Sequence, residues 1–184
     1  MGKIDTEIKN YKLKELYRLN RETAVEYISI LSYLSPQETA QELFYMSLRK
    51  VQEIRDLMQQ GRLDDLVDAV VIIQDKPIED IKELRVVHFF ALVSSIRRQV
   101  DIIKRGEQAK LNGKSYNQKW EAVNGGDRLA KFGIYNLLDK LADGDILKYE
   151  AILDLTYADV FTKLYRDTVM SDIEYEMSKI KSLT

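Results

Sequence analysis

The chain of 184 residues is predicted to be all-α, a multi-helix bundle with a C-terminal helical module after a polar loop. Apolar residues recur three and four positions apart along most of the sequence, which is the period of an amphipathic helix. Only two prolines interrupt the chain, and both stand near the expected start of a helix. No pair of strands and no internal repeat is evident.

The composition is that of a soluble, intracellular globular protein, with 45% apolar and 32% charged residues. The formal net charge is −2, so no overall charge draws the chain to nucleic acid or to an anionic membrane. The sequence contains no cysteine, which excludes disulfides, thiolate catalysis and cysteine metal sites. Unbroken apolar runs such as AVVII at 69–73 are far too short to cross a bilayer.

The clearest helix start is SPQE, beginning at Ser35. Ser35 can accept a backbone hydrogen bond as N-cap, Pro36 suits the first helical position, and Glu38 can close a capping box. A helix is therefore expected over 36–60, with Gly61 as its stop. The helices expected before it cover 10–20, which is the weaker one, and 21–34.

Segment 63–74 is ambiguous, because its β-branched run could form a strand. Its leucines and valines keep a helical period and no partner strand is evident, so a helix is favoured. A short acidic turn after Pro77 is expected to lead into a long helix over 84–111. The polar stretch 111–120 then has no period and contains glycine, which predicts a loop.

This loop suggests a domain boundary. The prediction is an N-terminal helical bundle at 1–112 and a C-terminal helical module at 113–184, with one continuous domain as the alternative. The helices expected in the C-terminal module cover 126–141, 145–154 and 157–181.

The last of these helices carries an apolar stripe with a spacing close to four residues. Asp159 and Lys163 on it are expected to form an i,i+4 ion pair worth about 0.3 kcal/mol. The stripe consists of Tyr165, Val169, Ile173, Met177 and Ile180.

The stretch NGGDRLAKFG at 124–133 is not a dinucleotide fingerprint, because its glycines do not fit the spacing and no strand precedes them. It is not a P-loop either, because no G-K-[ST] follows. Free N–H groups at a Gly-Gly helix start can bind an anion, but Asp127 in the first turn would repel one. The stretch therefore predicts a tight entry turn with close helix packing at Gly133.

The DGD sequence at 143–145 resembles the start of a calcium loop, but the EF-hand pattern fails there. Leu147 stands at position five and Lys148 at position six, where the pattern needs an oxygen ligand and a glycine. Gly144 is instead expected to end one helix, and Asp145 to cap the next.

No residue is predicted to be catalytic, to bind a cofactor or to hold a metal. His88 is the only histidine, so a zinc site or a nucleophile–base pair lacks partners. Carboxylate pairs such as Asp64–Asp65 or Glu174–Glu176 could do acid–base work, yet acidic clusters on amphipathic helices are usually solvated faces. An enzyme with a carboxylate metal site is therefore the least favoured class.

Eleven tyrosines against one tryptophan favour an interaction role, because tyrosine is an amphipathic anchor common at protein interfaces. The candidate interaction residues are Trp120, Tyr135, Tyr149, Tyr157, Phe161, Tyr165 and Tyr175. Four basic residues of the helix 84–111 could face a polyanion: Arg97, Arg98, Lys104 and Arg105. Acidic neighbours dilute this charge, so nucleic acid is a less favoured partner.

The segments WEAVNGGDRLAKFGIYNLLDKLADGDILKYEAILDL at 120–155 and YADVFTKLYRD at 157–167 resemble small structural or assembly proteins of tailed bacteriophages, including the crAss-like phages of gut bacteria. None of these residues is catalytic. The resemblance implies that the glycine turns are structural corners between short helices.

The resemblance further implies a non-catalytic virion protein, a neck or head–tail ring component that assembles as a homo-oligomer through helical surfaces. The alternative is a tail-assembly chaperone that is absent from the mature particle. The expected partners are the chain itself and other phage structural proteins, with no membrane and no cofactor. The expected location is the host cytoplasm during assembly, and the virion thereafter.

Overall fold

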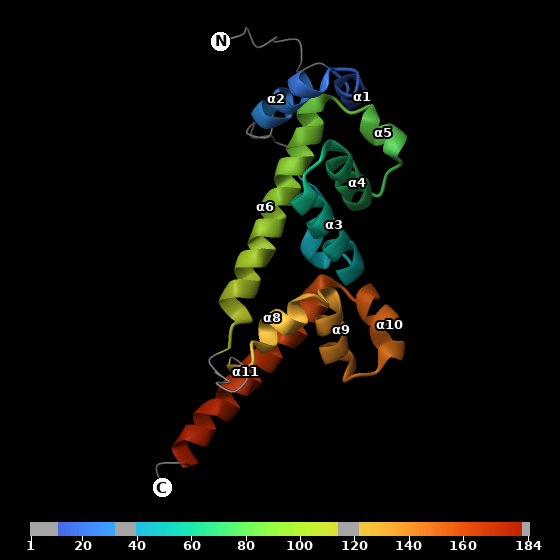
Figure 1. The fold of residues 1–184 in the computed structure, drawn as a ribbon. Helices are drawn as coiled ribbons and strands as arrows, with labels where there is room; N and C mark the ends of the chain where they lie inside the picture. The colour runs from blue at the N-terminus through green and yellow to red at the C-terminus, as the bar shows by residue number, and fades with distance from the viewer. Residues whose placement is uncertain (1–10, 32–39, 114–121, 182–184) are drawn as a thin grey trace. The chain divides into compact units, whose positions relative to one another are not determined.

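The computed structural model describes residues 11–31, 40–113 and 122–181 (Figure 1). The prediction of an all-α protein is confirmed, since the described residues form helices and only two isolated β-bridges. Short 3₁₀ helices, η2 (Leu43–Tyr45) and η3 (Ile146–Lys148), accompany the α-helices. The α-helices are α1 (Leu13–Leu16), α2 (Arg21–Leu31), α3 (Leu48–Gln60), α4 (Leu63–Gln74), α5 (Ile78–Lys82), α6 (Val86–Lys110), α8 (Gly125–Ala130), α9 (Ile134–Ala142), α10 (Tyr149–Asp154) and α11 (Tyr157–Lys181).

The chain divides into two compact units. Unit 1 comprises Met1–Leu43 and Lys50–Ile102, and unit 2 comprises Phe44–Arg49 and Ile103–Thr184. The short segment 44–49 and the last turns of α6 therefore belong to unit 2. The domain boundary expected between residues 112 and 113 stays a prediction.

The core of unit 1 is built on α3, α4 and the first part of α6. The β-branched run at 63–74 is helical, because its apolar residues fall at helical spacing and are buried along one face of α4. Phe89 and Phe90 of α6 are buried and meet edge to face, with ring centroids 5.1 Å apart. α4 ends at Asp75, which adopts a left-handed conformation with φ of 52°.

Two helix starts in unit 1 are joined by a pair of backbone hydrogen bonds, and we call such a pair a clasp. The amide of Leu13, the first residue of α1, donates to the carbonyl of Leu84 at 2.8 Å, and the amide of Val86, the first residue of α6, donates to the carbonyl of Tyr11 at 2.7 Å. The first amides of a helix have no partner within it, so this exchange satisfies one such amide in each helix.

The same clasp occurs in unit 2. The amide of Leu48, the first residue of α3, donates to the carbonyl of Leu155 at 2.8 Å, and the amide of Tyr157, the first residue of α11, donates to the carbonyl of Met46 at 2.8 Å. In each unit one of the two helices joined by the clasp has 25 residues: α6 in unit 1 and α11 in unit 2. The same pair of backbone hydrogen bonds therefore appears twice among the described residues, although the sequence shows no repeat.

Ion pairs stand beside both clasps at matching positions. Glu83, two residues before the bridged Arg85, pairs with Lys12 at 2.5 Å and with Lys14. Asp154, two residues before the bridged Thr156, pairs with Arg49 at 3.4 Å. The hydrogen bonds that the Lys12 and Lys14 side chains donate to Glu83 are the main cause that lowers the pKa of Glu83 to about 2.

Several predicted helix boundaries in the first half are wrong. The helix expected over 36–60 begins only at Leu48 within the described residues, after η2 and the unit 2 clasp. Ser35, Pro36 and Glu38 lie outside the described residues. The helix expected over 10–20 is reduced to α1, and the acidic turn after Pro77 is a short helix, α5.

The helix expected over 126–141 is two helices, α8 and α9, and Gly133 separates them. Gly133 has φ of 51° and ψ of −125°, a conformation open to glycine and strained for other residues. A Cβ atom at this position would meet nothing within 4 Å, so the predicted close helix packing there is wrong. The side-chain amide of Asn136 donates to the carbonyl of Leu129 at 2.7 Å and joins α9 to α8 across the turn.

The turns around 143–145 and the start of α11 follow local capping rules. Gly144 has φ of 78° and donates to the carbonyl of Asp139, and Asp145 accepts from the amide of Leu147 at 3.1 Å, so both cap predictions are confirmed. The predicted ion pair of Asp159 with Lys163 is wrong. Asp159 accepts from the Thr156 hydroxyl at 2.6 Å, and Lys163 pairs with Asp167 at 2.6 Å.

Candidate interaction surface

The first half of α11 packs through aromatic rings inside unit 2. The ring of Phe44 lies 5.5 Å from that of Tyr157 and 5.8 Å from that of Phe161, both edge-on, and Phe161 stacks with Tyr165 at 6.5 Å. Tyr157 is buried, and its hydroxyl donates to a carboxylate oxygen of Glu107 at 2.7 Å. Tyr157 therefore belongs to the core of unit 2, and Phe161 is half-buried against it.

The last turns of α6 lie along the same rings. A Cβ atom at Gly106 would be 3.9 Å from the ring of Phe161, so the α6 backbone passes close to that ring. The ammonium group of Lys110 lies 5.3 Å from the centre of the Tyr165 ring. α6 ends at Lys110, and beyond it Gly113 still lies close to α11, where a Cβ atom would be 3.4 Å from Thr168 and 3.1 Å from Asp172.

From Tyr165 onward α11 carries large apolar side chains that are exposed. We call this set the distal stripe; it extends the predicted one by Met170. Its members are 38% to 66% exposed in the chain. They are Tyr165, Val169, Met170, Ile173, Met177 and Ile180.

A second exposed apolar set lies on α8, α9, η3 and the turns on either side of α8, and we call it the corner patch. Leu147 is 88% exposed and its neighbour Ile146 is 70% exposed, which is unusual for large aliphatic side chains. An open concavity of 510 Å³ lies beside α8 and is lined in part by Leu129 and Phe132. The corner patch comprises Val123, Leu129, Phe132, Tyr135, Ile146 and Leu147.

The remaining predicted tyrosines differ in their exposure and in their contacts. Tyr135 is exposed and its ring lies 6.4 Å from that of Tyr149. Partial burial and a 3.0 Å hydrogen bond to Asp139 raise the pKa of the Tyr149 hydroxyl. Tyr175 is half-buried under the ammonium group of Lys179, at 4.3 Å. Trp120 lies outside the described residues.

The structure does not bring the predicted polyanion patch into one unit. Arg97, Arg98, Lys104 and Arg105 are all exposed on α6. The two residues Arg97 and Arg98 belong to unit 1, whereas Lys104 and Arg105 belong to unit 2.

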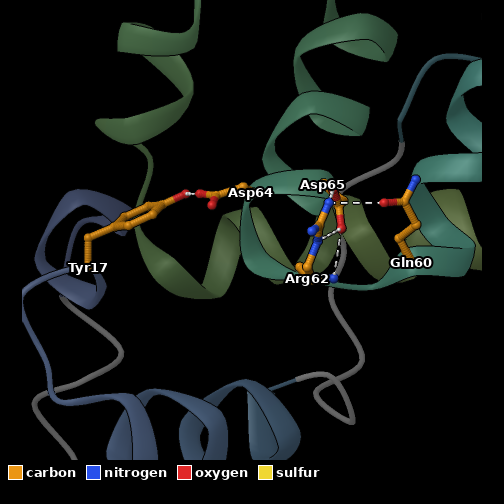
Figure 2. Close-up of polar contacts among 5 residues, drawn as sticks. All are labelled: Tyr17, Gln60, Arg62, Asp64 and Asp65. Carbon is orange, nitrogen blue, oxygen red and sulfur yellow. Dashed lines mark hydrogen bonds and ion pairs between the residues drawn. The ribbon is translucent and has the colours of Figure 1, made fainter.

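The acidic pair Asp64–Asp65 has structural partners, as Figure 2 shows. The Arg62 side chain donates to both carboxylate oxygens of Asp65, at 2.8 and 2.9 Å, and the Arg62 backbone amide donates to the same carboxylate at 3.2 Å at the start of α4. The side-chain hydrogen bond to Arg62 is the main cause that lowers the pKa of Asp65. Asp64 accepts from the hydroxyl of Tyr17 at 2.7 Å; burial and this hydrogen bond raise the pKa of Tyr17.

Two further findings bear on the site. Among the residues described, no group of three or more histidine, aspartate or glutamate side chains could hold a metal ion. In the same parts of the chain, no helix has the length and apolar character needed to cross a membrane.

Sequence reasoning found the distal stripe and missed the corner patch. Ile146 and Leu147 follow the cap residue Asp145 directly, in a stretch expected to be part of a helix over 145–154. No local signal marks them as exposed, because adjacent apolar residues on a helix can both be buried, as Phe89 and Phe90 of α6 are. Comparisons with protein-family models, with curated proteins and with solved structures gave no match.

Proposed function

We propose that the chain is a non-catalytic structural protein of a bacteriophage virion, a neck or ring component at the head–tail junction that assembles through its helical surfaces. The observation that carries the proposal is the exposed apolar surface of unit 2, made by the distal stripe and the corner patch. Large apolar groups gathered on the surface of a single chain are typical of protein interfaces. The phage context comes from the resemblance of residues 120–167.

Two features of the corner patch suit a protein interface. It combines an aromatic ring, Phe132, with aliphatic side chains, and cations stand at its margin. The ammonium group of Lys131 lies 5.1 Å from the centre of the Phe132 ring, and Lys148 follows Leu147 directly. Apolar centres with a charged rim are the usual anatomy of a binding surface.

These two lysines allow a direct test in infected cells. An amine-reactive cross-linker followed by mass spectrometry should join Lys131 and Lys148 to other virion proteins or to a second copy of the chain. Lys76, an exposed lysine of unit 1 outside both apolar sets, serves as the matched control. Cross-links from Lys76 but none from Lys131 and Lys148 would contradict the proposal.

The second candidate is a tail-assembly chaperone that is absent from the finished particle. The open concavity beside α8 favours it, because an apolar partner segment could lie there during assembly. Under this alternative the same lysines would cross-link to a tail protein in the lysate, and the chain would be missing from purified particles.

A further inference from the structure

Two stretches of the chain, 63–110 and 134–181, have the same order of elements. In each, a helix is followed by a short helix, by a bridged residue of a clasp and by a helix of 25 residues. These are α4, α5, Arg85 and α6 in the first stretch, and α9, α10, Thr156 and α11 in the second. Three pairs of matching positions are buried in both: Ile81 and Ile152, Val86 and Tyr157, and Phe89 and Val160. The two stretches are therefore versions of one helical arrangement and can be compared position by position.

The connection after the first helix begins in the same way in both stretches and then differs in length. Asp75 and Asp143 both have φ of 52°, and in each case the next amide donates to the helix carbonyl five positions before it, at 3.4 and 3.0 Å. α5 begins at Ile78, three residues after Asp75, whereas α10 begins at Tyr149, six residues after Asp143. The longer connection contains η3, which has three residues and which the described connection between α4 and α5 lacks.

Two large aliphatic side chains project from η3, and we call them the η3 tip. They are Ile146, which is 70% exposed, and Leu147, which is 88% exposed. The shorter connection is made instead by the exposed residues Lys76 and Pro77. Linking the two helices therefore requires neither η3 nor its apolar residues. Adjacent exposed aliphatic groups that the fold does not need are typical of a surface that binds another protein.

Unit 2 also carries a surface that can receive the η3 tip, which is the open concavity beside α8. Its volume is 510 Å³, and a cavity of about 150 Å³ already holds a benzene-sized group, so there is room for both side chains. Val123, Leu129 and Phe132 give it an apolar lining. Because Leu147 is almost fully exposed, the tip does not occupy the concavity of its own chain.

The charges around the two surfaces are complementary. Arg128 and Lys131 line the concavity together with one carboxylate, Asp127, which gives these three side chains a net charge of +1. The connection that carries the tip, 143–148, contains two aspartates and one lysine, a net charge of −1. An acidic connection against a basic rim favours contact between the two different surfaces over contact of either surface with itself.

We propose that the η3 tip of one copy of the chain inserts into the concavity beside α8 of a second copy. This inference rests on the proposed function, since it names one of the partners through which the protein assembles. The contact is heterologous, because each copy offers its tip to one neighbour and its concavity to another. Contacts of this kind form a ring when the rotation between neighbours closes, which is the assembly that a neck or ring component needs.

The chain contains no cysteine, so introduced cysteines report which surfaces meet. Lys148→Cys places a thiol beside the tip and Lys131→Cys places one at the concavity, and both leave the apolar groups of the contact in place. The two full-length variants are mixed in equal amounts and treated with a short bis-maleimide cross-linker. We expect a cross-linked dimer in the mixture and only the collision level of dimer from either variant alone.

Lys76→Cys is the matched control for the tip, because Lys76 lies in the shorter connection between α4 and α5. Its mixture with Lys131→Cys gives the collision level. A yield from Lys148→Cys and Lys131→Cys that is no higher than this level would overturn the proposal. Efficient cross-linking of Lys148→Cys alone, or of Lys131→Cys alone, would indicate a symmetric contact and would overturn it as well.

A further substitution tests whether the apolar tip itself makes the contact. Leu147→Asp added to Lys148→Cys should lower the yield with Lys131→Cys to the collision level, because a carboxylate loses its hydration in an apolar concavity. An unchanged yield would contradict the insertion of the tip.

Failure of this inference can be distinguished from failure of the proposed function. A specific cross-link between positions 148 and 131 in a chain that is absent from virions refutes the virion role alone. Presence in virions at a fixed copy number without this cross-link refutes the insertion of the η3 tip alone.

Discussion

The hydroxyl of Tyr157 donates a 2.7 Å hydrogen bond to the carboxylate of Glu107, which joins the first turn of α11 to the last turns of α6. Removing the hydroxyl in Tyr157→Phe leaves the ring in place but takes a donor from a partly buried carboxylate. We expect the free energy of unfolding to fall by about 1.5–3 kcal/mol. Urea denaturation of the full chain measures this. Tyr165→Phe, at an exposed ring, is the control and should change stability by less than about 0.5 kcal/mol.

Gly133→Ala should destabilise the corner between α8 and α9. The positive φ of Gly133 strains any residue with a Cβ atom, at a cost of about 1–3 kcal/mol. Gly126→Ala is a matched control, because Gly126 lies within α8 and a Cβ atom there meets nothing within 4 Å. Alanine at 126 should be neutral or stabilise by up to about 1 kcal/mol. Thermal denaturation that ranks the two variants equally would disprove the strain at Gly133.

The clasp of unit 1 should weaken in acid. The folded-state pKa of Glu83 is lowered to about 2 from 4.5, so its stabilising contribution is fully present above about pH 4.5 and is lost as the pH falls through about 2. Glu83→Gln should therefore be less stable than the natural chain at pH 6, with a difference that shrinks towards pH 2. A difference independent of pH between 6 and 2 would show that the carboxylate charge has no part in the clasp.

Leu147→Asp should weaken binding to a partner without changing the stability of the fold. Leu147 is almost fully exposed, so the free energy of unfolding should change by no more than about 0.5 kcal/mol. If the corner patch binds a partner, the same substitution should remove the cross-links of Lys148 to that partner. The control is Leu138→Ala, a buried residue of α9, which should lower stability by about 2–5 kcal/mol. Cross-links of Lys148 that persist in Leu147→Asp would place the interface elsewhere.

The sequence predictions that the structure confirms depend on neighbouring residues, such as helix caps and the helical period. Asp145 caps η3 because a short acidic side chain reaches an amide two residues on, and Gly61 ends α3 because its φ of 69° suits glycine. The helical period of 63–74 prevailed over its β-branched composition because the apolar face of α4 is buried in unit 1.

The parts that failed depend on contacts between distant residues. The start of α3 at Leu48 is set by a clasp with Leu155, more than a hundred positions away, which no local pattern near residue 48 reveals. Close packing was expected at Gly133, but a lone glycine in a helical pattern is equally compatible with the turn found there. Whether Tyr157 is buried and Ile173 exposed depends on where α6 ends, although both continue one apolar pattern along α11.

The decisive measurement is the copy number of the chain in purified phage particles, determined by quantitative mass spectrometry against the infected-cell lysate. A virion structural protein of the neck or a ring should be present at a fixed copy number per particle, on the order of one ring of subunits. Presence in the lysate but absence from the particles would contradict the virion role and favour the assembly chaperone.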